Sequence, residues 1–406
     1  MTDDHARPIP RRPATPGSAA PGGDDVYVVD TRRRAAGRPR PPAPPPAPAP
    51  DSGYDELGRP LPPRRGTPPP PPPPPPGPRR RRSGRTGLRV LLLLLLAWVA
   101  FVVVTPAHAW STVSRVDASP EGERPPAGDG HTYLLVGSDS REGLTAEQRK
   151  VLGTGSSEGR RTDTIILVHV PSGSGKAALI SVPRDSFLPI PGNGENKVNA
   201  AFAIGGPKLL AQTLEQATGL RIDGYLEIGF GGFANVVDSL GGVDICVQND
   251  IDDEKAHINL TKGCQTLDGP TALGYVRARY SDPKGDIGRA ERQRQFLGAV
   301  MKKAATPATV LVPWRWWGFT HAGAEGVLVG EDTGLVDGYR IAATMRAVSN
   351  DDALSLVVPI ANANATTSAG SSVVWNDERA QELFTMLREG TPLDAPPPGT
   401  DGEPTG

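Results

Sequence analysis

The hydrophobic positions divide the chain into three regions of different pattern. Residues 1–87 contain almost no aliphatic side chains, residues 90–114 form one long apolar run, and from residue 131 short apolar runs alternate with amphipathic segments. Such alternation is typical of an α/β protein, in which helices cover both faces of a sheet. The pattern therefore predicts a disordered tail, a membrane-spanning helix and a folded domain, in that order.

The apolar run is long enough to cross a bilayer. No Asp, Glu, Lys or Arg occurs from Val90 to Ser114, and about 20 apolar residues span a hydrocarbon core of about 30 Å. Arginines 79–82, Arg85 and Arg89 precede the run. Positive charge favours the cytoplasmic side, so we expect a single-pass protein of the cell membrane with a cytoplasmic N-terminus and an extracellular C-terminal domain. The alternative is a cleaved signal peptide, because residues 107–109 read "AHA", but the leader of about 80 residues favours an uncleaved anchor.

The remaining pattern predicts the elements of the exported part. Short apolar runs indicate strands, and segments with start and stop signals indicate helices. The "PSGSG" stretch indicates a tight turn between the second and third strands. We expect strands at residues 132–137, 163–170, 176–182, 224–230, 243–247 and 354–360, and helices at residues 207–219, 232–242 and 289–304. The domain boundaries that follow are a disordered tail (1–87), a transmembrane helix (88–110), a linker (111–130), an extracellular folded domain (131–389) and a second disordered tail (390–406).

The charge distribution limits which partner molecules are expected, and the cysteine content indicates whether a disulfide forms. The 406 residues carry a formal net charge of −1, but residues 1–87 hold 16 Arg and 8 Asp or Glu, which leaves the remainder at about −9. An acidic exported part argues against a nucleic-acid partner. The proline run 68–76 is interpreted as a stiff spacer, the alternative being a ligand for an aromatic-lined groove. Cys246 and Cys264 are the only cysteines; outside the cell we expect a disulfide, the alternative being two unrelated buried thiols.

Candidate chemistry lies at the predicted strand ends, and no H-E-x-x-H or phosphate-loop motif is present. Asp139 follows the first strand, and loops at strand ends are where α/β sheets place their sites. The other polar residues at such positions are Arg161, Asp163, Arg184, Asp185, Lys197 and Asn199.

A second cluster is rich in arginine. In "YVRARY" the side chains of Arg277 and Arg279 would share one face of a strand. On the next segment Arg289, Arg292, Gln293 and Phe296 would share one face of a helix, with Arg294 on the surface. An isolated arginine is usually a solvated surface group, but two on one strand face repel each other unless an anion joins them. Guanidinium groups bind phosphate in a bidentate manner, and Asp139 with Asp163 could hold Mg²⁺, so the pattern favours a magnesium-assisted pyrophosphate site.

The motifs also carry a family resemblance. In order along roughly residues 131–304 the chain reads "VGSDSREG", "RRTDTIILVHV", "ISVPRDSFLPIPG", "NKVNAAFAIGGPKLL", "GGVDICV", "LDGPTALGYVRARY" and "GDIGRAERQRQF". This series resembles the LytR-CpsA-Psr family of bacterial cell-envelope proteins. The resemblance implies an α/β/α sandwich around a central mixed sheet, with an apolar tunnel for a polyprenyl chain. It implies a Mg²⁺-dependent transfer of a glycopolymer from a polyprenyl-pyrophosphate carrier to peptidoglycan, so that the expected partners are this lipid-linked polymer, peptidoglycan and membrane lipid.

The resemblance also implies roles for individual residues. Asp139 and Asp163 match the metal ligands of the family. The residues that match its pyrophosphate clamp are Arg161, Arg184, Lys197, Arg277, Arg279, Arg289 and Gln293. Of all these, we assign catalytic roles to Asp139, Arg161, Asp163, Arg277 and Arg279, with Asp185 and Asn199 as weaker matches. The lipid is expected near Phe187, Leu188, Phe202, Phe230 and Phe233.

Three other functions are compatible with parts of the pattern. The same site could pass the pyrophosphate to water as a hydrolase, or could bind polyprenyl phosphates without chemistry as a scaffold. A transcriptional role is disfavoured, because an exported domain lies on the wrong side of the membrane from DNA. The segment "VPWRWWGF" (312–319) fits a membrane-facing patch, a sugar platform or simple packing equally well.

Overall fold

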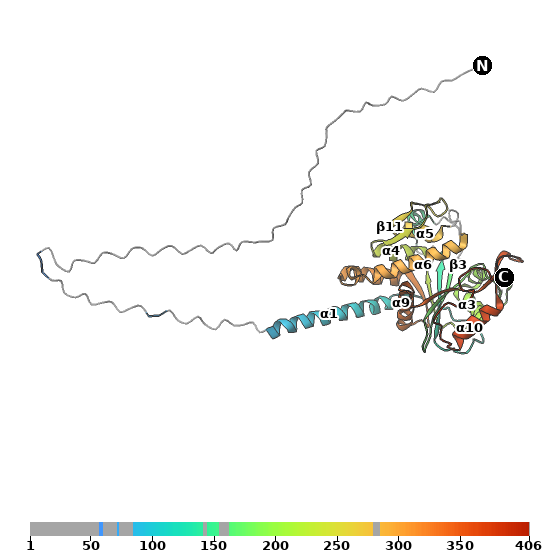
Figure 1. The fold of residues 1–406 in the computed structure, drawn as a ribbon, viewed down its shortest axis with the longest axis horizontal. Helices are drawn as coiled ribbons and strands as arrows, with labels where there is room; N and C mark the ends of the chain where they lie inside the picture. The colour runs from blue at the N-terminus through green and yellow to red at the C-terminus, as the bar shows by residue number, and fades with distance from the viewer. Residues whose placement is uncertain are drawn as a thin grey trace, which may run out of the picture. The chain divides into compact units, whose positions relative to one another are not determined.

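The computed structural model describes residues 57–59, 71–72, 84–140, 144–153, 162–278 and 285–405. Most of the predicted N-terminal tail therefore lies outside the described residues. The rest forms a seven-stranded mixed sheet with helices on both faces, as expected (Figure 1). Along the sheet the strand order is β1 (Ser114–Val116), β12 (Val327–Gly330), β7 (Gly224–Ile228), β2 (His131–Ser138), β3 (Thr162–Val170), β4 (Ala178–Val182) and β13 (Leu354–Val357).

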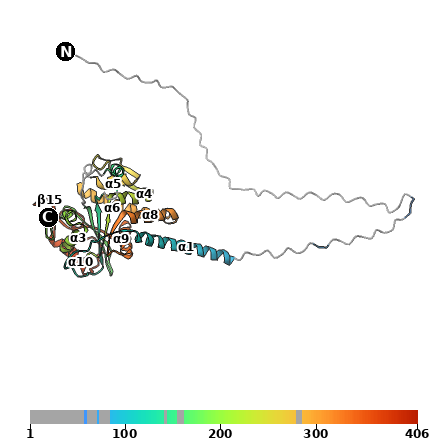
Figure 2. The same ribbon diagram turned by 180° about the vertical axis from the view of Figure 1, so that it is seen from behind.

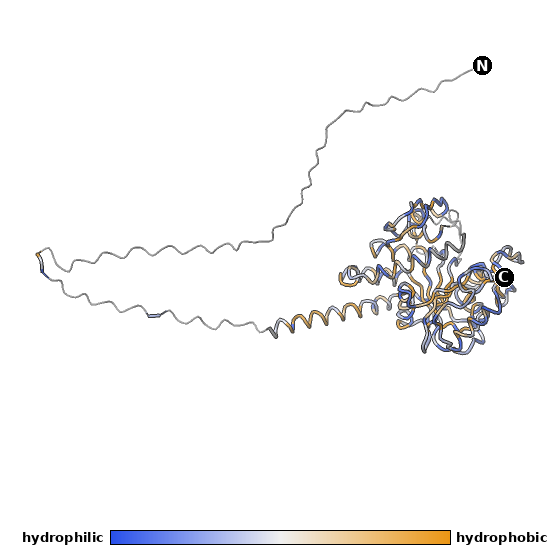
Figure 3. The backbone as a smooth tube through the Cα atoms, viewed as in Figure 1, coloured by the Kyte–Doolittle hydropathy of each residue, from blue (hydrophilic) through white to orange (hydrophobic). Residues whose placement is uncertain are grey.

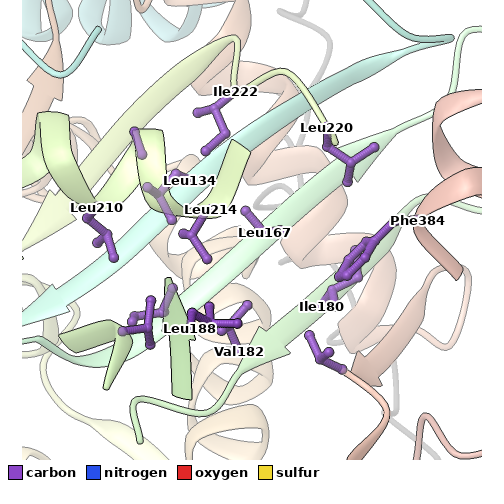
Figure 4. Packing of buried hydrophobic residues seen from close by; sticks show 14 of the residues in the cluster. Leu134, Leu167, Ile180, Val182, Leu188, Leu210, Leu214, Leu220, Ile222 and Phe384 are labelled. Carbon is purple, nitrogen blue, oxygen red and sulfur yellow. The ribbon is translucent and has the colours of Figure 1, made fainter. Parts of the chain in front are cut away.

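The central strands are buried on both faces, and this explains their nearly continuous apolar sequence. Alternate side chains of β2 and β3 enter opposite layers: Leu134 and Leu167 belong to one core, Tyr133 and Ile166 to the other. The first core lies under α3 (Val198–Thr218) and α10 (Asp377–Arg388), as Figure 4 shows for Leu210, Leu214 and Phe384.

Five helices lie over the other face of the sheet, and Figure 2 shows the two helical layers from behind. They are α4 (Phe230–Ser239), α5 (Gly269–Arg277), α6 (Gly285–Ala304), α8 (Pro313–Gly326) and α9 (Leu335–Ser349). Glycine permits a close approach between two of them, because a Cβ on Gly232 of α4 would lie 1.9 Å from the carbonyl oxygen of Gly326 in α8. The short helices are α2 (Ala146–Val151) and α7 (Pro307–Val310).

Four two-stranded antiparallel sheets complete the domain. They are β5 (Phe187–Ile190) with β6 (Gly194–Lys197), β8 (Val243–Val247) with β11 (Gly263–Leu267), β9 (Ile251–Asp253) with β10 (Ile258–Leu260), and β14 (Ile360–Thr367) with β15 (Gly370–Trp375). Cys246 on β8 lies opposite Cys264 on β11 and the two form a disulfide, which confirms the expected pairing.

Helix α1 (Gly84–Ser111) is the predicted apolar segment, and its side chains are mostly exposed. Within the described residues it has the length and composition that a membrane crossing requires over Thr86–Ser111. Figure 3 shows it as hydrophobic along most of its length. These features are consistent with a single-pass anchor.

The local prediction for the arginine-rich segment was wrong. The segment around "YVRARY" was expected to be a strand, but α5 continues through Arg277. The physical reason lies upstream: Asp268 caps the helix by accepting a hydrogen bond from the Thr271 amide, and Pro270 occupies the first turn. Burial of Leu273 and Tyr275 then stabilises the helix despite the β-forming sequence at its end.

The C-terminal residues were expected to be disordered from position 390, yet they lie against the domain up to Thr405. The Lys176 amide donates to the Leu393 carbonyl (2.9 Å), and the Val357 amide donates to the Thr400 carbonyl (2.8 Å). Leu393 itself is buried in the core under α3 and α10. The backbone groups of two strand ends thus find partners in a segment whose composition looks like a free tail.

The predicted helix from Pro207 is also longer than expected. Helix α3 begins at Val198, and its axis breaks at Gly205 and Gly206, where Gly206 has a φ of +64°. Glycine adopts this left-handed conformation without steric cost, and Pro207 then starts the second half in the position that proline favours. The start and stop signals at Pro207 and Gly219 therefore predicted only the second half of α3.

Candidate active site

The strand directions bring the predicted polar residues to one end of the sheet. Ser138, the last residue of β2, pairs with Thr162 at the start of β3. Ile165 of β3 pairs with Val182 at the end of β4, so two residues further outward the same register brings Asp163 opposite Arg184. Asp139 and the Pro183–Asp185 segment therefore leave β2 and β4, the two strands that flank β3, at the same end of the sheet, as the strand-end argument predicted.

A chain of ion pairs joins four of these residues. Arg184 donates through Nη1 to Asp163 Oδ1, and its Nε lies 3.3 Å from Asp185 Oδ2. Lys197 extends the chain, with Nζ 3.1 Å from Asp185 Oδ1. All four side chains are partly exposed, so this network is open to an incoming ligand. The Asn199 amide donates to the Arg184 carbonyl (3.2 Å), and this bond holds the loop after β4 against the start of α3.

An apolar cavity of about 530 Å³ begins beside this network. One wall is the sheet, with Leu135, Ile166 and Leu226. The helices that form the other walls are α4, α5, α6, α8 and α9. The polar side chains that line it are few: Ser138, Asp163, Thr164, Asp253, Lys255, Arg277 and Gln293. A mostly apolar enclosure with a few placed polar groups is typical of a ligand site.

Arg277 lies at the junction of the polar and apolar parts. It is the last residue of α5, its Nη1 donates to the Leu152 carbonyl (3.4 Å), and its guanidinium carbon lies 4.7 Å from the centre of the Phe230 ring. The contact with Phe230 fixes the planar group over the first residue of α4. Arg277 therefore reaches the cavity from a helix end rather than from the strand face that its sequence predicted.

The structure describes only part of the predicted clamp. Arg161 and Arg279 lie outside the described residues, as does the side chain of Arg289. Gln293 on α6 lines the cavity together with Asp163 and Arg277. Asp139 follows β2 at the same sheet end and is half-buried.

Arg292 has a structural role that sequence reasoning did not assign. Its side chain is buried, and it donates through Nε to the Tyr275 carbonyl (3.2 Å) and through Nη2 to the Ala278 carbonyl (2.5 Å). These carbonyls belong to the C-terminal end of α5, where a helix leaves acceptors unpaired. Arg292 thus fixes the turn that carries Arg277.

Two further polar residues of the cavity were also missed. Asp253 ends β9 and Lys255 lies in the turn that follows, and both line the cavity. The Asp253 carboxylate accepts from the Lys255 and Ala256 amides (both 3.0 Å), so it orders this turn. Their sequence carries no strand-end signal, because β9 has only three residues.

The residues expected near the lipid divide between two places. Phe230 and Phe233 line the cavity, and Phe233 stacks on Phe296 of α6 with ring centres 4.6 Å apart. Leu188 and Phe202 instead belong to the core on the opposite face of the sheet. The additional apolar lining comes from α8 and α9, with Phe319, Ile341 and Met345.

The donor set is compatible with Mg²⁺ shared with a phosphate. Within the described residues no group of three or more His, Cys, Asp or Glu side chains could hold a metal by itself. Asp139 and Asp163 flank neighbouring strand ends and supply two carboxylates. Mg²⁺ commonly binds one or two carboxylates and completes its shell with water and substrate phosphate oxygens, so these residues fit the ion only when substrate is present.

The fold and this site define an α/β/α protein whose apolar cavity begins at a cluster of acidic and basic side chains. The model of the LytR_cpsA_psr family matches residues 107–384, and the chain belongs to this family. The Probable cell wall biosynthesis protein LcpB of Corynebacterium glutamicum is 42% identical over 293 residues, which cover 71% of this chain and 69% of that protein.

Other relatives are more distant. The polyisoprenyl-teichoic acid–peptidoglycan teichoic acid transferase TagU of Bacillus cereus is 39% identical over 176 residues, 43% of this chain and 53% of TagU. The solved structure of a LytR-Csp2A-Psr enzyme from Actinomyces oris has a TM-score of 0.53 at 23% identity, and the match covers 68% of this chain and 96% of that one. This structural likeness confirms the expected fold.

Proposed function

We propose that the protein is a membrane-anchored transferase that moves a glycopolymer from a polyprenyl-pyrophosphate carrier to peptidoglycan outside the cell. One observation carries the proposal: Asp163, which forms an ion pair with Arg184, and Arg277 both line a cavity that is otherwise mostly apolar. A ligand that fits both parts must have an apolar chain joined directly to an anionic group. By its name, the relative TagU of Bacillus cereus transfers teichoic acid from a polyisoprenyl-linked form to peptidoglycan.

The basic side chains bind the pyrophosphate in this mechanism. Arg277 offers a planar guanidinium group at the cavity wall. Arg184, in the loop after β4, and Lys197, at the end of β6, add positive charge. Guanidinium binds phosphate oxygens in a bidentate manner, and this both orients the group and neutralises it. The prenyl chain lies in the apolar cavity, so the reacting phosphorus is held at the boundary between the two.

Asp163 changes partner during binding. In the structure its carboxylate is paired with Arg184. Mg²⁺, held by Asp139, Asp163 and the substrate, would supply positive charge to the transferring phosphate and the departing phosphate. If Asp163 held such an ion, the Arg184 guanidinium would be available to a phosphate oxygen while its Nε kept the contact with Asp185. The ion pair thus holds the arginine in place until the donor arrives.

The reaction itself is a phosphoryl transfer. The hydroxyl oxygen of a peptidoglycan sugar attacks the phosphorus attached to the glycopolymer, and a new phosphodiester bond forms. The bond from this phosphorus to the bridging oxygen breaks, and polyprenyl phosphate leaves with the electron pair. A carboxylate at the site accepts the hydroxyl proton. The pyrophosphate supplies the driving force, so the reaction needs no nucleotide outside the cell.

Reconstitution of the full chain tests the proposal. The protein is placed in lipid nanodiscs with a synthetic polyprenyl-pyrophosphate oligosaccharide, Mg²⁺ and a muramic-acid-containing peptidoglycan fragment, and products are identified by mass spectrometry. Phosphodiester-linked product together with polyprenyl phosphate is the expected result. Free phosphorylated oligosaccharide in the presence of acceptor would make the protein a hydrolase, and tight donor binding without any product would make it a scaffold.

A further inference from the structure

The segment formed by α7 and α8 exposes large apolar side chains. Leu311 is 60% exposed, Trp314 75% and Trp317 45%. Between Lys303 and Glu325 the sequence has one charged side chain of the Asp, Glu, Lys and Arg types, Arg315. Contiguous apolar surface of this kind is costly in water and marks a surface that is covered by another apolar phase or molecule.

Contacts with α1 place this segment along the candidate membrane span. The Trp316 indole Nε1 donates to the Val102 carbonyl (3.2 Å), and the His108 ring lies 5.9 Å from the Trp317 ring. Val102 is nine residues before Ser111, where α1 ends, a distance of about 13 Å along a helix. If Thr86–Ser111 crosses a bilayer, the N-terminal half of α8 lies at the depth of the outer leaflet.

Helix α8 has a cavity face and an exposed face. Phe319 and Gly323 line the cavity and are four residues apart, so they share one side of the helix. Trp314 and Trp317 are three residues apart and lie on the opposite side, where the Trp317 ring stacks on His321 at 3.9 Å. The helix is therefore a thin wall between the apolar cavity and the exposed aromatic surface.

We propose that residues 307–326 form an interfacial membrane element that lies in the outer leaflet beside α1 and delivers the donor's prenyl chain from the bilayer to the cavity. The inference rests on the proposed function, because it takes α1 to be the anchor. Tryptophan with an adjacent arginine is the composition of membrane interfaces. The cavity volume of about 530 Å³ is that of an ordinary small-ligand pocket, about 300–1,000 Å³, so a long prenyl chain enters only in part and its remainder stays in lipid.

The proposed occupant is the bilayer rather than a protein, because the exposed face is continuous with a helix that itself fits a bilayer. Its contacts with α1 run through Trp316, Trp317 and His321. If α8 faced water, the apolar side chains of α1 and those of α8 would both be exposed to solvent next to each other. One lipid environment covers both of them.

Spin labels at three positions test the inference in the full chain. Because the only two cysteines form a disulfide, single cysteines can be introduced as Trp314→Cys in α8, Leu93→Cys in α1 and Ser371→Cys in the β14–β15 hairpin. All three side chains are exposed in the protein alone. After reconstitution in phospholipid nanodiscs, power-saturation spectroscopy compares collision with lipid-soluble oxygen and with a water-soluble nickel chelate.

We expect the labels at 314 and 93 to collide preferentially with oxygen and the label at 371 with nickel. A nickel-accessible label at 314 with a lipid-exposed label at 93 would overturn the interfacial element and leave the anchor intact. A nickel-accessible label at 93 would overturn both. A label at 314 shielded from both reagents would show that a protein surface covers α8, and this also contradicts the inference. Leu311→Cys provides a second report on the same face.

Discussion

The guanidinium of Arg277 lies over the ring of Phe230, 4.7 Å from its centre, at the junction of a charged cluster and an apolar cavity. Cation–π contact of this kind contributes about 0.5–1 kcal/mol at exposed sites and more when water is excluded. Its geometric effect is more important here. The contact holds the guanidinium group against the first turn of α4, whose other aromatic side chain, Phe233, also lines the cavity.

Replacement of Arg277 should therefore impair transfer more than donor insertion into the cavity. We expect Arg277→Ala to lower kcat/KM for a polyprenyl-pyrophosphate donor by about 100-fold, which corresponds to about 2.7 kcal/mol of transition-state stabilisation. Arg277→Lys should recover only part of this loss, because an ammonium group keeps the charge but not the planar fork. Steady-state kinetics in nanodiscs provide the measurement.

Arg346→Ala is the matched control. Arg346 is an exposed arginine on α9 and should leave the kinetics within twofold of wild type, since it is not among the side chains that line the cavity. Wild-type turnover by Arg277→Ala, with an unchanged melting temperature, would refute the role of Arg277 in binding the pyrophosphate.

Asp163 and Asp185 both accept hydrogen bonds from Arg184, but only Asp163 lines the cavity. If Asp163 is a magnesium ligand, Asp163→Asn should raise the Mg²⁺ concentration needed for half-maximal transfer by tenfold or more. Asp185→Asn should lower turnover by disturbing Arg184 and Lys197 while leaving the Mg²⁺ requirement unchanged. Activity is measured across a Mg²⁺ titration after removal of metal with a chelator; equal Mg²⁺ requirements in the two variants would contradict the assignment.

The strand-end residues could be predicted from sequence because two local rules are sufficient. Apolar runs located β2, β3 and β4, and a polar residue after or before each run must lie at a sheet edge. The rules do not give the relative directions of the strands. The structure supplies them, because Ser138 pairs with Thr162 and Ile165 pairs with Val182 in antiparallel registers. The rules were sufficient for Asp163 and Arg184, which the structure joins directly by an ion pair.

The residues that form the cavity wall and the helical conformation at Arg277 could not be predicted in this way. Gly323 and Ala342 reach the cavity because α8 and α9 pack across the sheet from distant parts of the chain, and no local pattern encodes that packing. In "YVRARY" alternating β-branched and charged residues favour a strand, but the cap at Asp268 and burial of Tyr275 outweigh this weak preference. The packed C-terminal segment likewise depends on tertiary partners.

Filling the cavity should discriminate between donors by chain length. Ala342 of α9 lines the cavity, and its neighbour Ala343 does not; both are exposed to solvent or to the open lumen. Ala342→Trp should raise KM at least tenfold for a long-chain donor and leave a short-chain donor within threefold, because the ring removes space only where the chain would lie. Ala343→Trp should change neither. Equal kinetics for Ala342→Trp and wild type with the long-chain donor would indicate that the lipid does not use this cavity.

The disulfide should stabilise the domain without contributing to the chemistry. Cys246 and Cys264 lie opposite each other on β8 and β11 and close a loop with a sequence separation of 18. Loss of this constraint on the unfolded chain costs about 3 kcal/mol. We expect Cys246→Ala with Cys264→Ala to lower the melting temperature by several degrees and to keep kcat at temperatures well below the transition. An unchanged melting temperature in the double variant would show that the ladder of β8 and β11 alone is sufficient.

Buried His169 should make the domain less stable in mild acid. Its Nδ1 lies 3.0 Å from the hydroxyl of Thr132, and burial lowers its pKa from 6.5 to about 4, with a small opposing effect from Asp129 and a further lowering from His131. Between pH 6.5 and 4 the unfolded chain therefore binds a proton that the folded chain does not, so the free energy of unfolding falls as the pH is lowered through this window and is unaffected by this group above it. One pKa unit corresponds to about 1.4 kcal/mol, so the whole effect amounts to a few kcal/mol.

His169→Asn removes the titrating group and keeps a side chain that can bond to Thr132. We expect its melting temperature to vary less between pH 4 and 6.5 than that of the wild type. Thermal unfolding of the full chain at constant ionic strength, monitored at half-unit pH steps, measures the difference. Parallel curves for His169→Asn and the wild type would mean that this histidine charges as readily in the folded domain as in the unfolded chain, in spite of its burial beside Thr132.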